Sequence, residues 1–210
     1  IYKPDTFFSS IDYNGRYSYK NQPIITKWNI ARFAESIIPL INKDKETSIK
    51  LATEVIELFD KYFQKNWLEM MRSKIGLIRK HKDDKKLILR LLTIMEERKM
   101  DYTNTFRMLN QKKLYSKSLD FKNWYSDWQK RVENLGSFES SQKVMMIKNP
   151  SVIPRNNLVE QVLNDSKFGN YKSIKNFLRI LKKPYKNYLK ETIFIKDPKI
   201  DPSYKTFCGT

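Results

Sequence analysis

The sequence predicts an all-α fold, and two observations lead to this expectation. Apolar residues recur at steps of three and four over most of residues 26–182, which is the period of an amphipathic helix. Candidate strands are short, for example residues 192–195. Apolar residues make up 40% of the chain and aromatic residues 13%, which is enough for a core. We therefore expect an irregular segment at residues 1–25, a helical lobe at 26–182 and an extended tail at 183–210.

The first two helices are predicted from their apolar stripes. One is expected from Thr26, which can cap its first turn, to about residues 39–43. The second begins near Asp44 and continues to Ile78 as one bent helix or as two, and Gly76 is its weakest point. We interpret the stripe of this second helix as core; it contains Ile49, Ala52, Val55, Ile56, Phe59 and Phe63.

A charged corner separates this pair from the next helix. Residues 79–82 and 85–86 are basic and are expected to be exposed to solvent. Asp83 and Asp84 supply negative charge for the N-terminus of a helix that ends near residues 97–99. We interpret Asp83-Asp84, like Glu96-Glu97, as solvated faces or helix-end charges instead of metal ligands.

The remaining helices are predicted between residues 100 and 182. Asp101 or Thr103 caps one helix, residues 119–133 form another with a broad aromatic side, and a shorter helix is expected at residues 137–146. Two more contain Leu158 to Leu163 and Ile174 to Leu181. Residues 149–157 are expected to be an extended bridge, because each of two prolines disfavours helix at the residue before it.

The net charge of +18 suggests nucleic acid as a partner, but its distribution argues against this function. Most of the 41 basic residues are lysines, and they are spread along every segment instead of forming one arm or one helix face. No apolar run is long enough to span a membrane and no leader is visible. The chain has one histidine, His81, and one cysteine, Cys208, which leaves little for metal or disulfide chemistry.

The stretch from Asp12 to Pro23 is the densest in unusual residues. It combines the turn signal Asn14-Gly15, Arg16 between aromatic residues and the amides Asn21 and Gln22. The simplest interpretation is a loop that leads into a helix. No phosphate-binding glycine loop, nucleophile elbow or zinc-protease motif occurs in the chain, which has only five glycines.

Several motifs together resemble the selenoprotein O family of protein adenylyltransferases. They are Gly15-Arg16-Tyr17 with Tyr19, Asn21-Gln22-Pro23, Trp28-Asn29-Ile30, Ala34-Glu35, Asp101 to Arg107, Asn149-Pro150, Ile153 to Asn156, Pro184-Tyr185 and Thr206 to Thr210. They follow the order of the family and span the whole chain. The chain differs from the family at Ser9 to Asp12, where Asn-His-Ser-Asp is more frequent, and at Asn157, where the family often has His or an aromatic residue.

The resemblance implies the helical C-terminal lobe of a protein-kinase-like fold, in an enzyme of the pseudokinase type. Such an enzyme transfers AMP from ATP, with Mg²⁺, to Ser, Thr or Tyr hydroxyls of protein substrates and releases pyrophosphate. In the family, the residues that contact ATP and Mg²⁺ precede the Gly-Arg-Tyr motif. We therefore expect this chain to be a C-terminal fragment that holds no catalytic or metal-binding residue and is inactive alone.

The resemblance gives roles to few residues. Arg16, Tyr17, Asn21 and Gln22 are expected at the edge of the catalytic cleft. Arg16 could bind a phosphate or carboxylate, or brace an internal carboxylate. Cys208 matches the position where the family has Cys or selenocysteine, which makes it the candidate for a redox role; from the residues alone it could equally be inert.

Two other classes of function remain open. One is a Lys-rich helical module that binds a protein or nucleic acid, and the other is a purely structural relative of the enzyme. The expected location is the cytoplasm of a bacterium, or a mitochondrion if the source is eukaryotic. The sequence does not indicate an oligomeric state.

Overall fold

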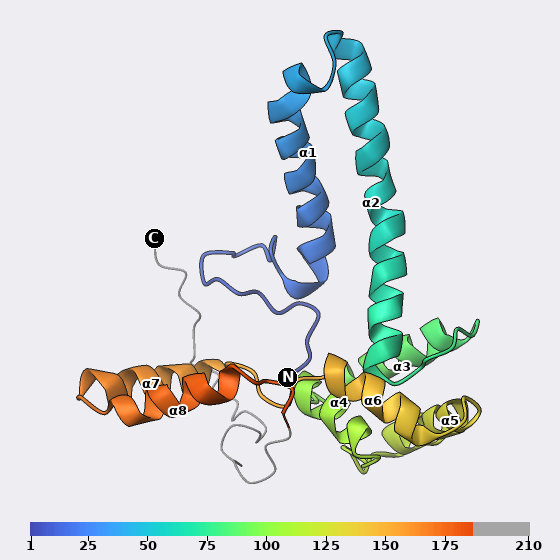
Figure 1. The fold of residues 1–210 in the computed structure, drawn as a ribbon, viewed down its shortest axis with the longest axis vertical. Coiled ribbons are helices and arrows are strands. Elements are labelled where there is room, and N and C mark those ends of the chain that lie inside the picture. The colour runs from blue at the N-terminus through green and yellow to red at the C-terminus, as the bar shows by residue number, and fades with distance from the viewer. Residues whose placement is uncertain (187–210) are drawn as a thin grey trace. The chain divides into compact units, whose positions relative to one another are not determined.

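The computed structural model describes residues 1–186, and every regular element in this range is a helix. Figure 1 labels the α-helices α1 to α8, and a short 3₁₀ helix, η1 (Tyr19–Asn21), precedes α1. The predicted all-α class is confirmed. The candidate strand at 192–195, Cys208 and most of the predicted tail lie outside the described residues.

The described chain divides into two compact units. One contains residues 3–69, and the other contains residues 1–2 and 70–186. The first unit holds the N-terminal irregular segment, η1, α1 (Gln22–Ile41) and most of α2 (Lys45–Lys74). The second holds the last turn of α2 and the six helices that follow.

Helix α1 begins four residues earlier than the sequence predicted. We expected Thr26 to cap it, but the helix starts at Gln22, follows Asn21 and has Pro23 in its first turn. Proline suits this position, because its fixed φ is helical and its missing N–H would have no partner in the first turn. The Thr26 hydroxyl instead donates to the Gln22 carbonyl at 2.7 Å, one turn back.

Helices α1 and α2 form an antiparallel hairpin within the first unit (Figure 1). Asp44 precedes α2 and accepts a hydrogen bond from the Thr47 amide at 2.8 Å, so the predicted start of this helix is confirmed. Lys27 of α1 and Asp60 of α2 form an ion pair of 2.6 Å across the hairpin.

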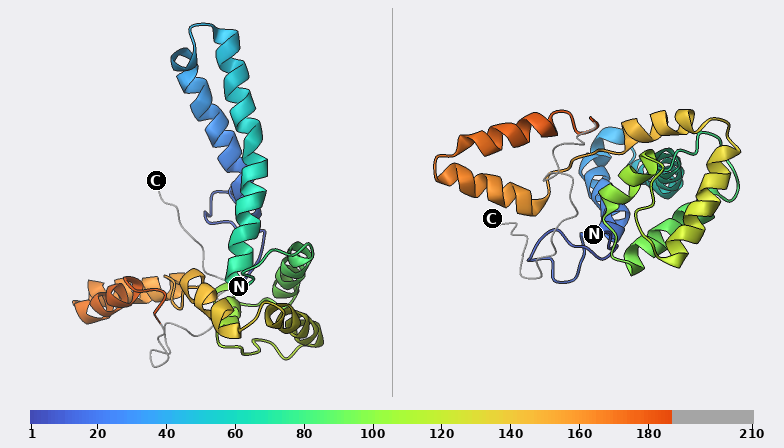
Figure 2. Two further views of the ribbon diagram at one scale, coloured as in Figure 1. Left: turned by 45° about the vertical axis from the view of Figure 1, so that its right-hand side comes forward. Right: turned by 90° about the horizontal axis from the view of Figure 1, so that it is seen from below.

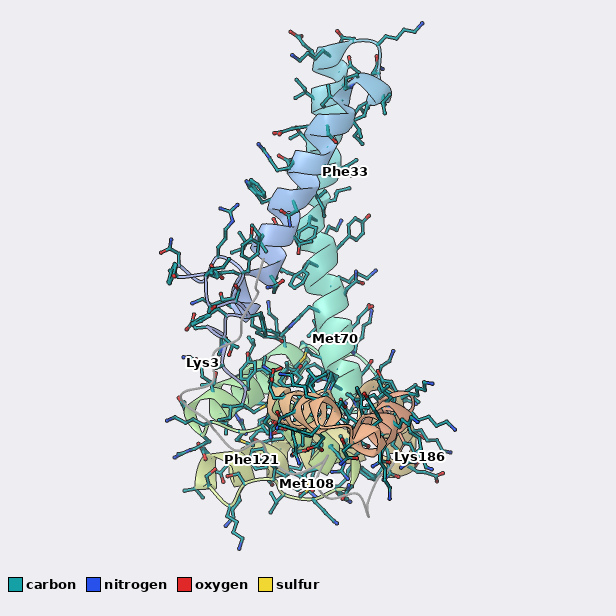
Figure 3. The ribbon with its side chains drawn as sticks, turned by 90° about the vertical axis from the view of Figure 1, so that its left-hand side faces the viewer. Lys3, Phe33, Met70, Met108, Phe121 and Lys186 are labelled. Atoms are coloured by element: carbon teal, nitrogen blue, oxygen red, sulfur yellow. The ribbon has the colours of Figure 1, made fainter. Side chains whose placement is uncertain are left out.

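The apolar side chains of the hairpin are largely exposed. Figure 3 shows side chains standing out along both helices, among them the labelled Phe33, which is 64% exposed. The prediction that the α2 stripe is core is wrong for this chain, since Val55 is 68% exposed and Ile49 47%. A groove of about 670 Å³ runs between the helices and is lined by Ala31, Ala34, Ile38, Ile49, Ala52 and Ile56. Within residues 3–69, nothing covers this face.

Helix α2 is a single helix that ends where Gly76 was expected to weaken it. Gly76 has a φ of +75°, which residues with a Cβ rarely adopt. A Cβ at this position would also lie 3.0 Å from the Ser141 Cβ. The glycine therefore ends the helix and allows α6 to approach.

Four helices form the core of the second unit: α3 (Asp84–Glu97), α4 (Tyr102–Asn110), α5 (Leu119–Glu133) and α6 (Phe138–Lys148). Helix α3 contacts α5, and α6 contacts both α4 and α5. The predicted aromatic side of α5 is buried, and Trp124 and Trp128 stack with ring centroids 6.2 Å apart. Their indole N–H groups donate to the carbonyls of Leu87 at 2.9 Å and Ile75 at 2.8 Å.

Asp84 is not solvated, which corrects one sequence prediction. It lies in the first turn of α3, as expected, but is only 1% exposed. One carboxylate oxygen lies 2.8 Å from Nε of Arg72, and the other 3.0 Å from Nε of Arg131. The two arginines neutralise the Asp84 carboxylate, which would be costly to bury without a positive charge beside it. Asp83, Glu96 and Glu97 are exposed as predicted.

Helices α7 (Asn156–Lys167) and α8 (Tyr171–Leu181) form a second antiparallel hairpin, which Figure 2 shows side by side. Leu158 and Val162 of α7 pack against Phe177 of α8. Residues 149–155 form the predicted non-helical bridge, and its Val152 packs on Ile180. The bridge is two residues shorter than predicted, because α7 already begins at Asn156.

Replacing Trp128 with Phe should destabilise the core. The change removes the donor to the Ile75 carbonyl and part of a fully buried ring, so we expect a loss of about 1–3 kcal/mol in the free energy of unfolding. Urea unfolding followed by circular dichroism measures this loss. Leu119→Ala, at a position 74% exposed on the same helix, is the control and should change stability by less than about 0.5 kcal/mol. Equal effects of the two changes would contradict the packing described.

Candidate functional site

Four of the predicted site residues lie in one segment of the first unit, residues 12–22, which is called the Arg16 loop below. The segment consists of a loop, the 3₁₀ helix η1 and the first residue of α1. Asp12 organises it: one carboxylate oxygen accepts from the Arg16 amide and the other from the Tyr17 amide, both at 2.8 Å. Gly15 has a φ of +62°, which favours glycine at this turn. The carboxylate therefore fixes the backbone that carries Arg16.

The two amide side chains brace the same loop. Asn21 donates through Nδ2 to the Gly15 carbonyl at 2.8 Å, and Gln22 donates through Nε2 to the Tyr17 carbonyl. Both amide nitrogens are thus engaged with the loop's own backbone. Within this loop, Asn21 and Gln22 act as supports for Arg16 and Tyr17.

The side chain of Arg16 stacks on an aromatic ring. Its guanidinium carbon lies 4.7 Å from the centroid of Trp28 on α1 and 5.9 Å from that of Tyr17. Arg32, one turn after Trp28, lies 5.4 Å from the same centroid. Cation–π contacts of this kind hold the planar guanidinium in place while leaving its edge available.

The structure thus brings Arg16, Tyr17, Asn21 and Gln22 together in one segment, in which Asn21 is half-buried and the other three are exposed. Arg16 was expected either to bind a phosphate or carboxylate ligand or to pair with a carboxylate of this chain. No carboxylate of the described residues forms an ion pair with Arg16, so the second interaction does not occur among them. Trp28 was not predicted as its partner. The helical spacing of Trp28 and Arg32 signals only their own contact. The contact of Arg16 with Trp28 depends on how the loop folds back on α1, which the sequence pattern does not describe.

A second cluster of polar residues is buried in the other unit, and sequence reasoning did not identify it. Asp101 caps α4, as predicted, by accepting from the Asn104 amide at 2.8 Å. Its two oxygens also accept from Arg155 at 2.7 and 2.8 Å. Burial by itself raises the pKa of Asp101, but the hydrogen bonds and charge of Arg155 and the Asn104 amide outweigh it and lower the pKa.

Lys74, in the last turn of α2, is also buried. Its ammonium nitrogen lies 4.8 Å from the ring centroid of Phe106 and 5.3 Å from that of Tyr102. Burial lowers the pKa of Lys74 to about 8. Its backbone carbonyl accepts from Asn149 at 2.8 Å, which joins the end of α2 to the residue after α6.

The described residues do not offer a metal site. No group of three or more His, Cys, Asp or Glu side chains within residues 1–186 is placed to hold an ion. Within the same range, no helix is long and apolar enough to cross a membrane.

The chain is similar to proteins that share one described class of activity. It is 44% identical to a protein nucleotidyltransferase YdiU of Pelagibacter ubique (strain HTCC1062), over 100% of this chain and 45% of that protein. It is 41% identical to the protein of the same name in Clostridium botulinum (strain Alaska E43 / Type E3) and 43% to that in Nitrosococcus oceani. Each of these matches covers the whole chain and 44% of the relative.

The family profile described as protein adenylyltransferase SelO matches residues 1–182. The match covers the Arg16 loop and every described helix, and the chain therefore belongs to the SelO family. The resemblance noted from the sequence motifs is confirmed. The chain spans about 45% of the length of the curated relatives it matches.

Replacing Asp12 with Ala should loosen the Arg16 loop. The change leaves the amides of Arg16 and Tyr17 without their acceptors, and we expect their hydrogen exchange to accelerate by about tenfold, as for loss of a helix cap. Amide exchange followed by NMR measures the change. Asp5→Ala removes only an exposed ion pair with Lys20 and is the control. Unchanged exchange at Arg16 and Tyr17 would show that Asp12 does not hold the loop.

Replacing Lys74 with Met should alter the pH dependence of stability. In the folded chain Lys74 loses its proton near pH 8, and in the unfolded chain near about pH 10.4. Between these values the unfolded state binds more protons, so stability rises with pH, by at most about 1.4 kcal/mol per pH unit. Lys74→Met should lack this rise, and Lys113→Met, at an exposed position, should keep it. Urea unfolding from about pH 7 to pH 10 tests this, and parallel curves for the wild type and Lys74→Met would refute it.

Proposed function

We propose that this chain is the helical C-terminal lobe of a protein adenylyltransferase with a protein-kinase-like fold. The whole enzyme transfers AMP from ATP to Ser, Thr or Tyr hydroxyls of proteins and releases pyrophosphate. The observation that carries this proposal is the family match along residues 1–182, together with relatives named protein nucleotidyltransferase over the entire chain. Within the chain, residues 26–182 are the lobe, preceded by the irregular segment that contains the Arg16 loop.

The residues that bind ATP and Mg²⁺ belong, in this proposal, to a part of the enzyme outside this chain. The chain covers only 45% of the relative from Pelagibacter ubique, and its described residues form no cluster that fits a metal ion. The exposed apolar face of the α1–α2 hairpin also fits a chain that packs against further protein. We therefore expect the chain alone to be inactive and derive no catalytic step within it.

The Arg16 loop lies at the edge of the catalytic cleft in this proposal. Arg16 is permanently charged, presents a planar fork of donors and has no ion-pair partner among the described residues. The Trp28 ring and the Asp12-fixed backbone hold the fork in place before a ligand arrives. Arg16 then binds a phosphate of the nucleotide or an acidic group of the protein substrate, with Tyr17 beside it and Asn21 and Gln22 as supports.

The proposed partners are proteins that present Ser, Thr or Tyr hydroxyls. The expected location remains the cytoplasm, in keeping with relatives from Pelagibacter ubique and Nitrosococcus oceani. Cys208 keeps its proposed redox role, which rests on the family resemblance alone. The alternative of a Lys-rich binding module rests on the net charge of +18.

The test uses the full-length protein that contains this chain. With Mg²⁺ present, ATP labelled on the α-phosphate should label protein substrates, and ATP labelled on the γ-phosphate should not. Arg16→Lys keeps the charge but loses the planar fork, and should lower the rate of labelling by about tenfold or more.

Arg32→Lys is the matched control, because Arg32 contacts the same Trp28 ring and pairs with Glu35. It should label at the wild-type rate. Transfer of the γ-phosphate, or no transfer together with steeply salt-dependent binding of nucleic acid, would overturn the proposed function. Equal rates for the two variants would overturn only the role of Arg16.

A further inference from the structure

Arg107 is a buried cation that has no counter-ion among residues 1–186. It lies on α4 and is only 8% exposed. Its Nε has no hydrogen-bond partner, and none of the ion pairs found in the described part of the chain includes Arg107. The carboxylate nearest to it along the chain, Asp101, is engaged by Arg155. A buried charge left unpaired is costly to a fold, so a missing partner is to be expected here.

Arg107 lines a small polar cavity in the second unit, where α4 and α6 come together (Figure 1). The cavity has a volume of about 70 Å³. Most of the side chains that line it are polar: Arg107, Asn110, Gln111, Gln142, Asn149 and Ser151. All of these residues belong to one compact unit, so the cavity does not depend on how the two units are arranged.

The wall of the cavity is held in place by its own hydrogen bonds. Asn149 donates through Nδ2 to Oδ1 of Asn110 at 2.9 Å and to the Lys74 carbonyl at 2.8 Å. Gln142 donates to the Asn110 backbone carbonyl at 2.7 Å. Oδ1 of Asn149, which is 2% exposed as a residue, has no hydrogen-bond partner. Arg107 and Asn149 both line the cavity, and each contributes a buried polar atom, Nε and Oδ1, that has no hydrogen-bond partner.

The size and charge of the cavity limit what can fill it. Pockets that bind drug-sized ligands have volumes of about 300–1,000 Å³, several times the volume of this cavity. Burial lowers the pKa of Arg107, but an arginine stays charged at neutral pH. A guanidinium forms its strongest hydrogen bonds with phosphate and carboxylate oxygens.

We propose that this cavity binds one phosphate or carboxylate group, with Arg107 as its charged contact and the surrounding amides as its polar walls. The group comes either from a free phosphate ion or from a small carboxylate. The inference concerns a site that takes no part in the proposed transfer reaction and does not depend on it.

The experiment uses the full-length protein and two probes, inorganic phosphate and acetate, with chloride at matched ionic strength as the reference. We expect one probe to bind saturably in isothermal titration calorimetry and to raise the melting temperature. Arg107→Gln should weaken this binding by at least about tenfold, the loss expected for a charge-assisted hydrogen bond. Arg179→Gln removes one charge from the surface of α8 and should bind like the wild type.

A response to phosphate identifies a phosphate site, and a response to acetate alone identifies a carboxylate site. Asn110→Asp covers the case in which Arg107→Gln does not fold. It places a carboxylate one turn from Arg107 in the same cavity and can still accept from Asn149, so it should melt at a higher temperature and lose the response to either probe. No response beyond chloride in the wild type, or an unchanged response in Asn110→Asp, would overturn the proposal.

Discussion

The carboxylate of Asp101 is the interaction on which the arrangement of the second unit most depends. It caps α4, and both of its oxygens accept from Arg155, which lies 54 residues later and immediately before α7. Both side chains are buried, so separating them would leave an uncompensated charge in the interior. The ion pair therefore holds the start of α4 next to the start of α7. Asp84 does the same for α3, since Arg72 of α2 and Arg131 of α5 share its oxygens. Two carboxylates thus tie the ends of most helices in this unit.

Some groups in the described chain lack the partner that their burial or their apolar character calls for. Arg107 is buried as deeply as Arg155 but lacks a described carboxylate, and the apolar residues of the α1–α2 hairpin lack a covering surface. The two cases differ in kind. The cavity at Arg107 has a volume of about 70 Å³, whereas the hairpin exposes an apolar groove of about 670 Å³. Arg16 is a third case, held by Trp28 with its donors exposed.

The fold was predictable where its causes are local. The three- and four-residue steps of Phe121, Trp124, Trp128 and Val132 predicted α5, and the Asp101 cap was visible because cap and helix adjoin. Burial of Asp84 was missed because Arg72 and Arg131 are far from it in sequence. The Arg16 loop was predicted as a unit, but its stacking on Trp28 depends on how a loop folds back on a helix, which periodicity does not describe. The sequence does not show that Arg107 lacks an ion-pair partner, because this depends on Asp101 pairing with Arg155 in the folded chain.

In the proposed function, the Arg16 loop borders the catalytic cleft of a SelO-family enzyme whose nucleotide-binding part lies outside this chain. A crystal structure of the full-length protein with Mg²⁺ and a non-hydrolysable ATP analogue tests it most directly. We predict that the other part of the enzyme holds the nucleotide and covers the α1–α2 hairpin, with the Arg16 guanidinium at the rim of the nucleotide or substrate site. A nucleotide bound on a face remote from the Arg16 loop would contradict the claim.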